Sequence, residues 1–588
     1  MDQHGEVEMQ TLKNEEKLPE NEKKESYQSI PEITRSVVRT RLSPINDILN
    51  LAETRINEFF QAHKALCVLT LGIVFLVGFL VYFCFAVTMN AERAKDLIYV
   101  TVFGFFCLCY WLIKKFFGRV IWNRCFKPIA VALDSHQRLL NWIGCLALVG
   151  FLIFWICWDT RKDPGRLISL AGLLVYILIG FLFSKQRDRI KWRPVITGFA
   201  LQFFFGLLIL RTEIGFNVFK WLGDRINILL SFSGPGTELI FGKSDVFAFA
   251  VLPIITYFSS LTYVLYYLGF MQVIINKLAW ILQITMGATA TESVNTAGNI
   301  FLGQTESLLL IRPFIPKMTK SELHALMTGG LATIAGSLMA LYIIFGVSAS
   351  HLLSASVMSA PAALAMSKLM YPETEEPEFV GEVKTEATEE RNIFEAIAVG
   401  ASLSIPIIVN VVVMMIAFVS IVSLFNGLLS WLGSMVDCPQ LSFEFLCSYL
   451  FMPFAYLMGV EYQDSFHVGE MLGTKTFLTE FIAYKQLSAM IKNRKFQIAG
   501  GLQLSVRSEV ISTYALCGFS NFGSMGVIMG VLTGIAPEKR TIFSQLVFRA
   551  LVAATLACFM TASIAGLLYK DLDVTPTPGP TNVTRIMP

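Results

Sequence analysis

Long apolar runs recur along this chain and determine the solvent in which it folds. Roughly 20 helical residues cross the hydrocarbon core of a bilayer, and uncharged apolar stretches of about that length occur repeatedly. Only 15% of the 588 residues are charged, whereas a soluble globular chain averages about 25%. Since lipid cannot satisfy exposed backbone groups, spanning segments of this length are helices. The sequence therefore predicts an all-α polytopic membrane protein.

About eleven transmembrane helices are expected. Residues 1–63 are too polar to bury a core, and this polar start predicts no cleavable signal peptide. The apolar spans that follow lie near residues 65–88, 96–113, 139–158, 166–184, 194–211, 246–268, 325–346, 350–369, 395–424, 508–530 and 546–568.

Basic residues orient these spans, because loops rich in Lys and Arg stay in the cytoplasm. The connections 114–128 and 184–194 are strongly basic and fall on the same side as the N-terminal tail. The acidic linker 371–393 lies on this cytoplasmic side as well. Because eleven spans follow a cytoplasmic N-terminus, the tail 571–588 is expected to be extracellular. That tail carries the only N-x-S/T sequon, which predicts glycosylation at Asn582. Cys438 and Cys447 could pair if extracellular, but two free thiols are the simpler interpretation.

Two apolar regions, 288–316 and 466–492, are interrupted by glycine and polar residues, and each precedes a similar sequence. "KSELHALMTGGLATIAGSL" (320–338) and "RSEVISTYALCGFSNFGSM" (507–525) both begin with a basic residue before Ser-Glu and both reach Gly-Ser at the same offset. Polar, glycine-containing backbone at bilayer depth is tolerated only where it lines a protein cavity. We therefore expect inverted repeats in 161–370 and 394–570, each with a re-entrant hairpin and a broken helix, as in many secondary transporters.

Glu306 and Glu480 are the most informative polar residues in these regions. A carboxylate inside a span costs about 3 kcal/mol on insertion scales, so it faces a cavity or a partner. One interpretation is that each accepts hydrogen bonds from a bound polar solute. The alternative is a structural ion pair, for instance with Arg312 or Lys485. Asn521 and Ser524 are interpreted in the same way as contacts for a polar solute, with a purely structural role as the alternative, while Asn299 could bind an ion or cap a hairpin.

Several long motifs resemble the concentrative nucleoside transporters. They are "GNIFLGQTESLLLIRPF" (298–314), "MTKSELHALMTGGLATIAGS" (318–337), "SASVMSAPAALAMSKL" (354–369), "KTFLTEFIAY" (475–484) and "SVRSEVISTYALCGFSNFGS" (505–524), and the likeness covers roughly residues 190–570. Residues 64–160 resemble the extra N-terminal helices of animal members. The resemblance implies a sodium-coupled nucleoside symporter of the plasma membrane, assembled as a homotrimer, with two re-entrant hairpins.

The resemblance also implies roles for individual residues. Those that match the family's nucleoside contacts are Gln304, Thr305, Glu306, Leu338, Glu480, Phe519, Asn521 and Ser524. Those that match its sodium site, partly through backbone carbonyls, are Asn299, Leu302, Thr333 and Ile334. The sequence departs from the family at Thr479, where asparagine is expected before the glutamate. Gly303-Gln304 is similar to members of broad specificity, whereas Leu338 is similar to pyrimidine-preferring ones.

The expected function is sodium-coupled uptake of both purine and pyrimidine nucleosides, such as uridine and adenosine. A pyrimidine-preferring carrier and a proton-coupled carrier, with Glu306 or Glu480 titrating, remain alternatives. A nucleoside-gated channel is another alternative. An intramembrane enzyme is less favoured, because the sequence offers no nucleophile–base pair, and no nucleic-acid partner is expected.

Overall fold

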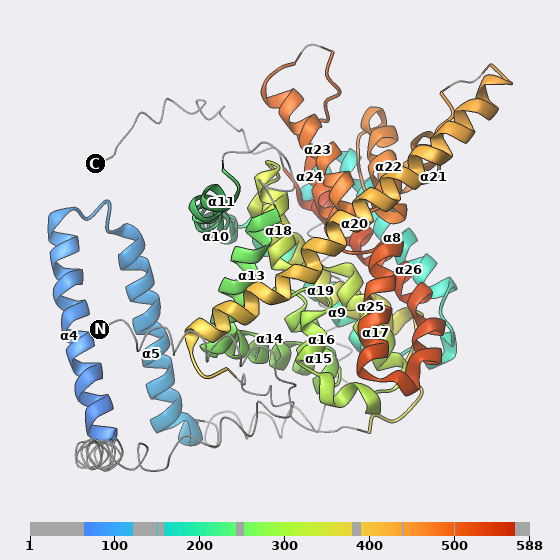
Figure 1. Cartoon of the computed structure of the whole chain (residues 1–588). Helices are drawn as coiled ribbons and strands as arrows, with labels where there is room; N and C mark the ends of the chain where they lie inside the picture. The colour runs from blue at the N-terminus through green and yellow to red at the C-terminus, as the bar shows by residue number, and fades with distance from the viewer. Residues whose placement is uncertain are drawn as a thin grey trace, which may run out of the picture. The chain divides into compact units, whose positions relative to one another are not determined.

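The computed structural model describes residues 64–121, 150, 158–242, 252–378, 390–437, 440–498 and 500–570. Within these ranges all regular structure is helical, which agrees with the predicted all-α class. The chain divides into two compact units, Met1–Phe151 and Leu152–Pro588 (Figure 1). The tail 1–63, most of the span predicted near 139–158, Cys438 and Asn582 lie outside the described residues.

In its described residues the first unit forms two helices, α4 (Lys64–Met89) and α5 (Lys95–Ile121). The turn between them is held by Asn90, whose Oδ1 accepts hydrogen bonds from the backbone of Glu92 and Arg93. Apolar side chains such as Phe75 are largely exposed on this unit. An apolar surface of that kind suits contact with lipid.

The second unit is built from long helices around a buried centre of three, α17, α19 and α26. Helix α9 packs on α19. Both α17 and α19 pack on α26. Helix α13 packs on α20, and α21 packs on α22. The bounds are α8 Leu167–Leu182, α9 Trp192–Arg211, α10 Glu213–Ser231, α11 Ser233–Phe241, α13 Leu252–Tyr267, α14 Phe270–Met286, α15 Ala290–Gly298, α16 Glu306–Leu309, α17 Lys320–Ala332, α18 Gly336–Ile344, α19 Ala349–Met370, α20 Ile393–Ser434, α21 Phe443–Leu457, α22 Tyr462–Phe477, α23 Glu480–Lys495, α24 Val506–Leu516, α25 Phe522–Ile535 and α26 Arg540–Leu568.

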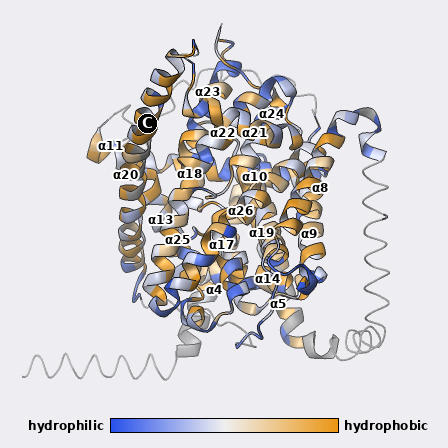
Figure 2. Ribbon diagram, turned by 90° about the vertical axis from the view of Figure 1, so that its right-hand side faces the viewer, coloured by the Kyte–Doolittle hydropathy of each residue, from blue (hydrophilic) through white to orange (hydrophobic). Residues whose placement is uncertain are grey.

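Hydropathy follows these helices as a membrane requires. Hydrophobic residues dominate their middle portions, and hydrophilic residues collect toward their ends (Figure 2). Among the described residues, seven helices are long and apolar enough to cross a bilayer, or eight if the bent pair α13–α14 forms one span. The sequence-based count of eleven also includes the segment near 139–158, the span near 96–113, which corresponds to α5, and the span near 508–530, which the structure divides into α24 and α25.

Helix breaks occur twice in the same order. In the first series α15 and α16 are separated by residues 299–305, and α17 is separated from α18 by residues 333–335. In the second series α22 and α23 are separated by residues 478–479, and α24 is separated from α25 by residues 517–521. Glu306 and Glu480 each open the second helix of their pair. This order matches the predicted repeat, while the inverted orientation of the two copies stays a prediction.

The breaks approach one another closely, and glycine permits this approach. The amide of Gly336 donates to the carbonyl of Phe301 at 3.2 Å, and that of Phe519 donates to the carbonyl of Thr333 at 3.2 Å. Gly518 has a φ of +148°, and a Cβ there would lie 2.9 Å from the carbonyl oxygen of Ala332. Only glycine combines that backbone conformation with that contact at low cost.

Candidate functional site

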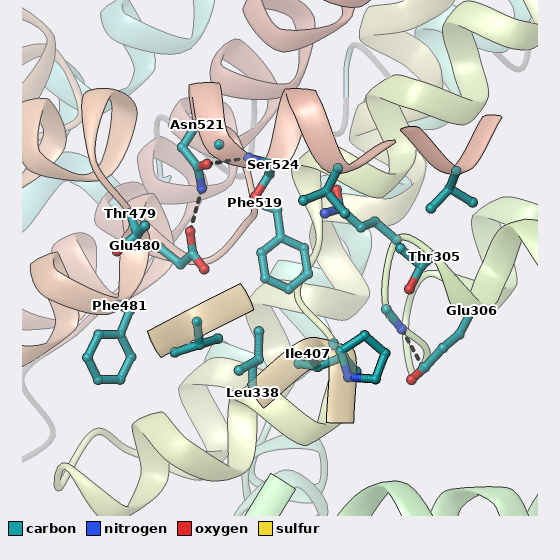
Figure 3. A pocket seen from close by; sticks show the side chains of 18 of the residues that line it. Thr305, Glu306, Leu338, Ile407, Thr479, Glu480, Phe481, Phe519, Asn521 and Ser524 are labelled. Atoms are coloured by element: carbon teal, nitrogen blue, oxygen red, sulfur yellow. Dashed lines mark hydrogen bonds between the residues drawn. The ribbon is translucent and has the colours of Figure 1, made fainter. Parts of the chain in front are cut away.

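A cavity of about 430 Å³ lies where the breaks of the two series meet. Its volume falls within the range of about 300–1,000 Å³ that small-molecule sites occupy. All eight residues that the resemblance assigns to nucleoside binding line it: Gln304, Thr305, Glu306, Leu338, Glu480, Phe519, Asn521 and Ser524 (Figure 3). Glu306 and Glu480 therefore line one shared chamber, which fits the interpretation that both contact a bound solute.

Glu480 is held from two sides in a buried position. Its Oε1 accepts a hydrogen bond from the hydroxyl of Tyr342 at 3.2 Å, and its Oε2 accepts one from Nδ2 of Asn521 at 2.5 Å. Asn521 is in turn fixed as the N-cap of α25, because its Oδ1 accepts from the amide of Ser524 at 2.7 Å. The carboxylate is thus oriented before any solute arrives, and its remaining lone pairs can accept hydroxyl donors.

Glu306 is held locally, by its own helix start. Its Oε2 accepts a hydrogen bond from the amide of Gly303 at 2.9 Å. Oε1 of the neighbouring Gln304 is buried and has no hydrogen-bond partner among the described residues. Neither Glu306 nor Glu480 forms an ion pair with Arg312, Lys485 or any other residue in the described ranges, so the structural ion-pair interpretation gains no support.

Apolar side chains complete the cavity and give it a flat lining. The ring of Phe519 lies between the Glu480 side and the Glu306 side, with Leu338 and Ile407 beneath it (Figure 3). The long helix α20 adds further apolar residues, Leu403, Pro406 and Val411. A chamber with carboxylates and amides at its ends and apolar surface between them suits a planar heterocycle that carries hydroxyl groups.

Thr479, the departure from the family pattern, is the N-cap of α23. Its side chain accepts a hydrogen bond from the amide of Ile482 at 3.4 Å. Threonine and asparagine are both established capping residues. Threonine in place of the family's asparagine therefore preserves the cap of α23, the helix that begins at Glu480.

The four residues matched to a sodium site gather beside the cavity, at the first pair of breaks. Asn299 is fully buried, and neither side-chain polar atom has a partner among the described residues. The side chain lies against the last turn of α17, because a Cβ on Gly329 would be 2.8 Å from Nδ2 of Asn299. Thr333 and Ile334 lie in the break that follows α17, and Leu302 is buried in the break between α15 and α16. Neutral oxygens near a helix C-terminus suit a hard monovalent cation.

Residues that support Glu480 from elsewhere in the fold were not predicted from the sequence. Tyr342 lies one helical turn beyond Leu338 on α18, and that spacing could have suggested a shared face. The apolar wall from α20 had no signal, because its residues look like any lipid-facing helix. Lys475, which is buried in the last turn of α22 before the break at 478–479, was also not among the predicted site residues.

An all-helical membrane protein whose broken helices enclose a cavity with oriented carboxylates has the architecture of a transporter of polar solutes. Comparison with known proteins identifies the family. Residues 171–244 match the Na⁺ dependent nucleoside transporter N-terminus, 248–349 match a nucleoside recognition (Gate) domain, and 351–566 match the Na⁺ dependent nucleoside transporter C-terminus.

Individual relatives agree with these matches. The chain is 47% identical over 523 residues to solute carrier family 28 member 3 of Rattus norvegicus, covering 87% of this chain and 74% of that protein. It is 44% identical over 509 residues to sodium/nucleoside cotransporter 1 of Mus musculus, covering 84% and 77% respectively. The protein belongs to the Na⁺-dependent nucleoside transporter family. It is therefore a transporter rather than an enzyme, and sodium is the ion on which transport in this family depends.

Solved structures match as well. An inward-facing, substrate-bound structure of CNTnw is 35% identical and covers 69% of this chain and 98% of its own, with a TM-score of 0.65. An outward-facing variant of CNTnw is 36% identical, covers 69% and 99%, and has a TM-score of 0.66. The two scores are equivalent, so the likeness identifies the fold without favouring either state.

Proposed function

We propose that the protein imports nucleosides of both base classes across the plasma membrane, driven by the sodium gradient. The observation that carries this proposal is the single cavity that brings Glu306 and Glu480 together with an aromatic ring between them. The Glu306 side, with Gln304 and Thr305, recognises the nucleobase. The Glu480 side, with Asn521 and Ser524, recognises the ribose hydroxyls, and Leu338 and Phe519 pack against the base.

Sodium binds at Asn299 and the neighbouring backbone of Leu302, Thr333 and Ile334. The unpartnered amide of Asn299 supports this assignment, because a buried polar group without a partner is costly unless a ligand satisfies it. In this arrangement the two helix pairs α15–α16 and α22–α23 act as re-entrant hairpins. The membrane potential adds about 2.3 kcal/mol per charge per 100 mV to the uptake of each sodium ion.

Topology and assembly follow from the resemblance and the charge pattern. The N-terminal tail is cytoplasmic, the C-terminal tail with the glycosylated Asn582 is extracellular, and the protein is a homotrimer. Treatment with a glycosidase, which should sharpen and shift the band of the natural protein but not of an Asn582→Gln variant, tests the orientation. Chemical cross-linking in native membranes tests the trimer.

Uptake of labelled uridine by cells that express the protein tests the function. Replacement of external sodium by choline should abolish concentrative uptake, and a channel would equilibrate uridine without concentrating it. Undiminished uptake in choline that follows a proton gradient would establish the proton-coupled alternative. Competition by unlabelled purine and pyrimidine nucleosides tests the selectivity: inhibition by pyrimidines alone would reject the broad assignment.

A further inference from the structure

Helix α15 carries a second buried amide, that of Asn295, one helical turn before Asn299. Side chains four residues apart lie on one face of a helix, so both amides point to the same side of α15. Only 1% of the surface of Asn295 is exposed, and its Oδ1 has no hydrogen-bond partner among the described residues. A buried acceptor without a donor lowers stability unless a ligand supplies the missing contact.

The two amides lie together against the last turn of α17. A Cβ added to Gly329 would lie 3.6 Å from Nδ2 of Asn295 and 2.8 Å from Nδ2 of Asn299. Glycine at this position therefore leaves the space that both amides occupy. The carbonyl of Gly329 also accepts a hydrogen bond from the hydroxyl of Thr333 at 2.9 Å, and Thr333 belongs to the proposed sodium site. Asn295 thus adjoins that site through the same glycine.

A purely structural role would pair these amides with protein groups or with each other. Both side-chain polar atoms of Asn299 and Oδ1 of Asn295 lack a partner in the described part of the chain, so the two amides do not hydrogen-bond to one another. The place that they share also favours positive charge. Helix α15 ends at Gly298 and α17 at Ala332, and the last carbonyls of each helix carry the negative end of its dipole. Neutral oxygens at such a place suit a hard monovalent cation.

We propose that Asn295 is a further sodium-binding residue, whose side-chain oxygen binds the same ion as Asn299. The inference rests on the proposed sodium site and extends it by one turn of α15. One ion satisfies both amides and fastens α15 to the last turn of α17. Asn295 therefore raises the affinity for sodium without adding to the number of ions carried with each nucleoside.

Substitution by leucine tests this assignment, because leucine keeps the branched shape of asparagine and removes its oxygen. In Asn295→Leu, the sodium concentration that gives half-maximal uridine uptake should rise several-fold, while the charge moved per uridine should stay that of the natural protein. Asn295→Asp is the rescue variant: it keeps an oxygen at this position, ionised or protonated, and should require no more sodium than the natural protein.

Ser293→Ala is the matched control on the same helix. The Ser293 hydroxyl is as deeply buried as Asn295 and has no partner among the described residues. It lies two residues from Asn295, however, and therefore on another face of α15. Its removal should leave the sodium dependence of uptake unchanged, whereas a general defect of α15 would change it.

Thermal unfolding of the purified protein without nucleoside gives a readout that does not depend on transport. Sodium, compared with choline at constant ionic strength, should raise the melting temperature of the natural protein, because an ion that binds only the folded state stabilises it. This rise should require several-fold more sodium in Asn295→Leu and the natural concentration in Ser293→Ala.

Natural sodium dependence of Asn295→Leu in either measurement overturns the inference, and so does an equal shift in Ser293→Ala. A lower charge per uridine in Asn295→Leu also overturns it, because Asn295 would then bind an ion of its own. If the leucine variant does not fold, melting of Asn295→Asp decides: sodium dependence at or below the natural concentration supports the inference, and a shift to higher concentrations overturns it. Sodium-independent uptake by the natural protein would instead refute the proposed function.

Discussion

Removal of the Tyr342 hydroxyl is the sharpest test of how the cavity recognises ribose. In Tyr342→Phe the carboxylate of Glu480 loses the donor to Oε1 and keeps the bond from Asn521 to Oε2. The ring remains in place, because it stacks on Tyr484 with centroids 4.2 Å apart. The substitution therefore changes the orientation of the carboxylate and leaves the packing intact.

The magnitude follows from the geometry of this bond. A hydrogen bond to a charged group contributes about 1.5–3 kcal/mol, and we take the lower end because the Tyr342–Glu480 distance is a long 3.2 Å. Since about 1.4 kcal/mol corresponds to a factor of ten, the KM for uridine should rise by up to about tenfold, the limit that is reached when the whole bond energy serves to orient the carboxylate for the ribose. The increase should be much smaller for uridine analogues that lack the ribose hydroxyl bound by Glu480.

Initial rates of uptake for uridine, 2′-deoxyuridine and 3′-deoxyuridine provide the assay, normalised to protein at the cell surface. Tyr484→Phe is the matched control, because its hydroxyl donates to the carbonyl of Thr513 at 2.9 Å and not to Glu480. Both variants lose one buried hydroxyl from the same stacked pair, but only Tyr342→Phe should discriminate between ribose and deoxyribose. Equal increases in KM for all three substrates, or none, would refute the reasoning.

Four further tests, two of which include a control variant, concern individual residues in and around the site. Glu480→Gln keeps the shape but not the charge, so uridine uptake should fall at least tenfold at normal surface expression; normal uptake would remove Glu480 from the site. Asn299→Ala should raise several-fold the sodium concentration that gives half-maximal uptake, and an unchanged value would exclude it as a ligand. Thr479→Val should cost about 1 kcal/mol through the lost cap, whereas Thr479→Asn should be nearly neutral in thermal unfolding. Gly518→Ala should destabilise by about 1–3 kcal/mol because of its backbone conformation and the Ala332 contact, while Gly526→Ala, with open space around it, should not; equal melting temperatures would contradict the strain.

Sequence alone predicted the main architecture because the membrane simplifies the problem. Uninterrupted apolar helices such as α9 and α19 were placed within a few residues of their observed ends, since length and hydropathy define them. The cost of polar groups in lipid also located the breaks, and Glu306 and Glu480 were found by the same argument. Recognition of family motifs then supplied the other cavity residues, whose composition is not distinctive.

The remaining features depend on contacts that a linear pattern does not contain. The spans predicted near 325–346 and 508–530 are broken helices, as their small and glycine residues predicted, but hydropathy alone does not give the exact breaks at 333–335 and 517–521. Tyr342 gave only the weak signal of its spacing from Leu338, because an aromatic residue in an apolar helix is ordinary until its hydroxyl is placed beside Glu480. The apolar wall of α20 likewise depends on how that helix crosses the others (Figure 1).

The bond from the Phe519 amide to the Thr333 carbonyl has a consequence for the energetics of transport. Under the proposed assignments, one peptide group adjoins the ion and the other carries the ring beneath the nucleobase, so two ligands share a single backbone link. Binding of either ligand then orders the site of the other, and the coupling free energy between the two sites is the same in both directions. A variant that weakens only this coupling must therefore lower two affinities by the same factor: that of the nucleoside-bound protein for the ion, and that of the ion-bound protein for the nucleoside.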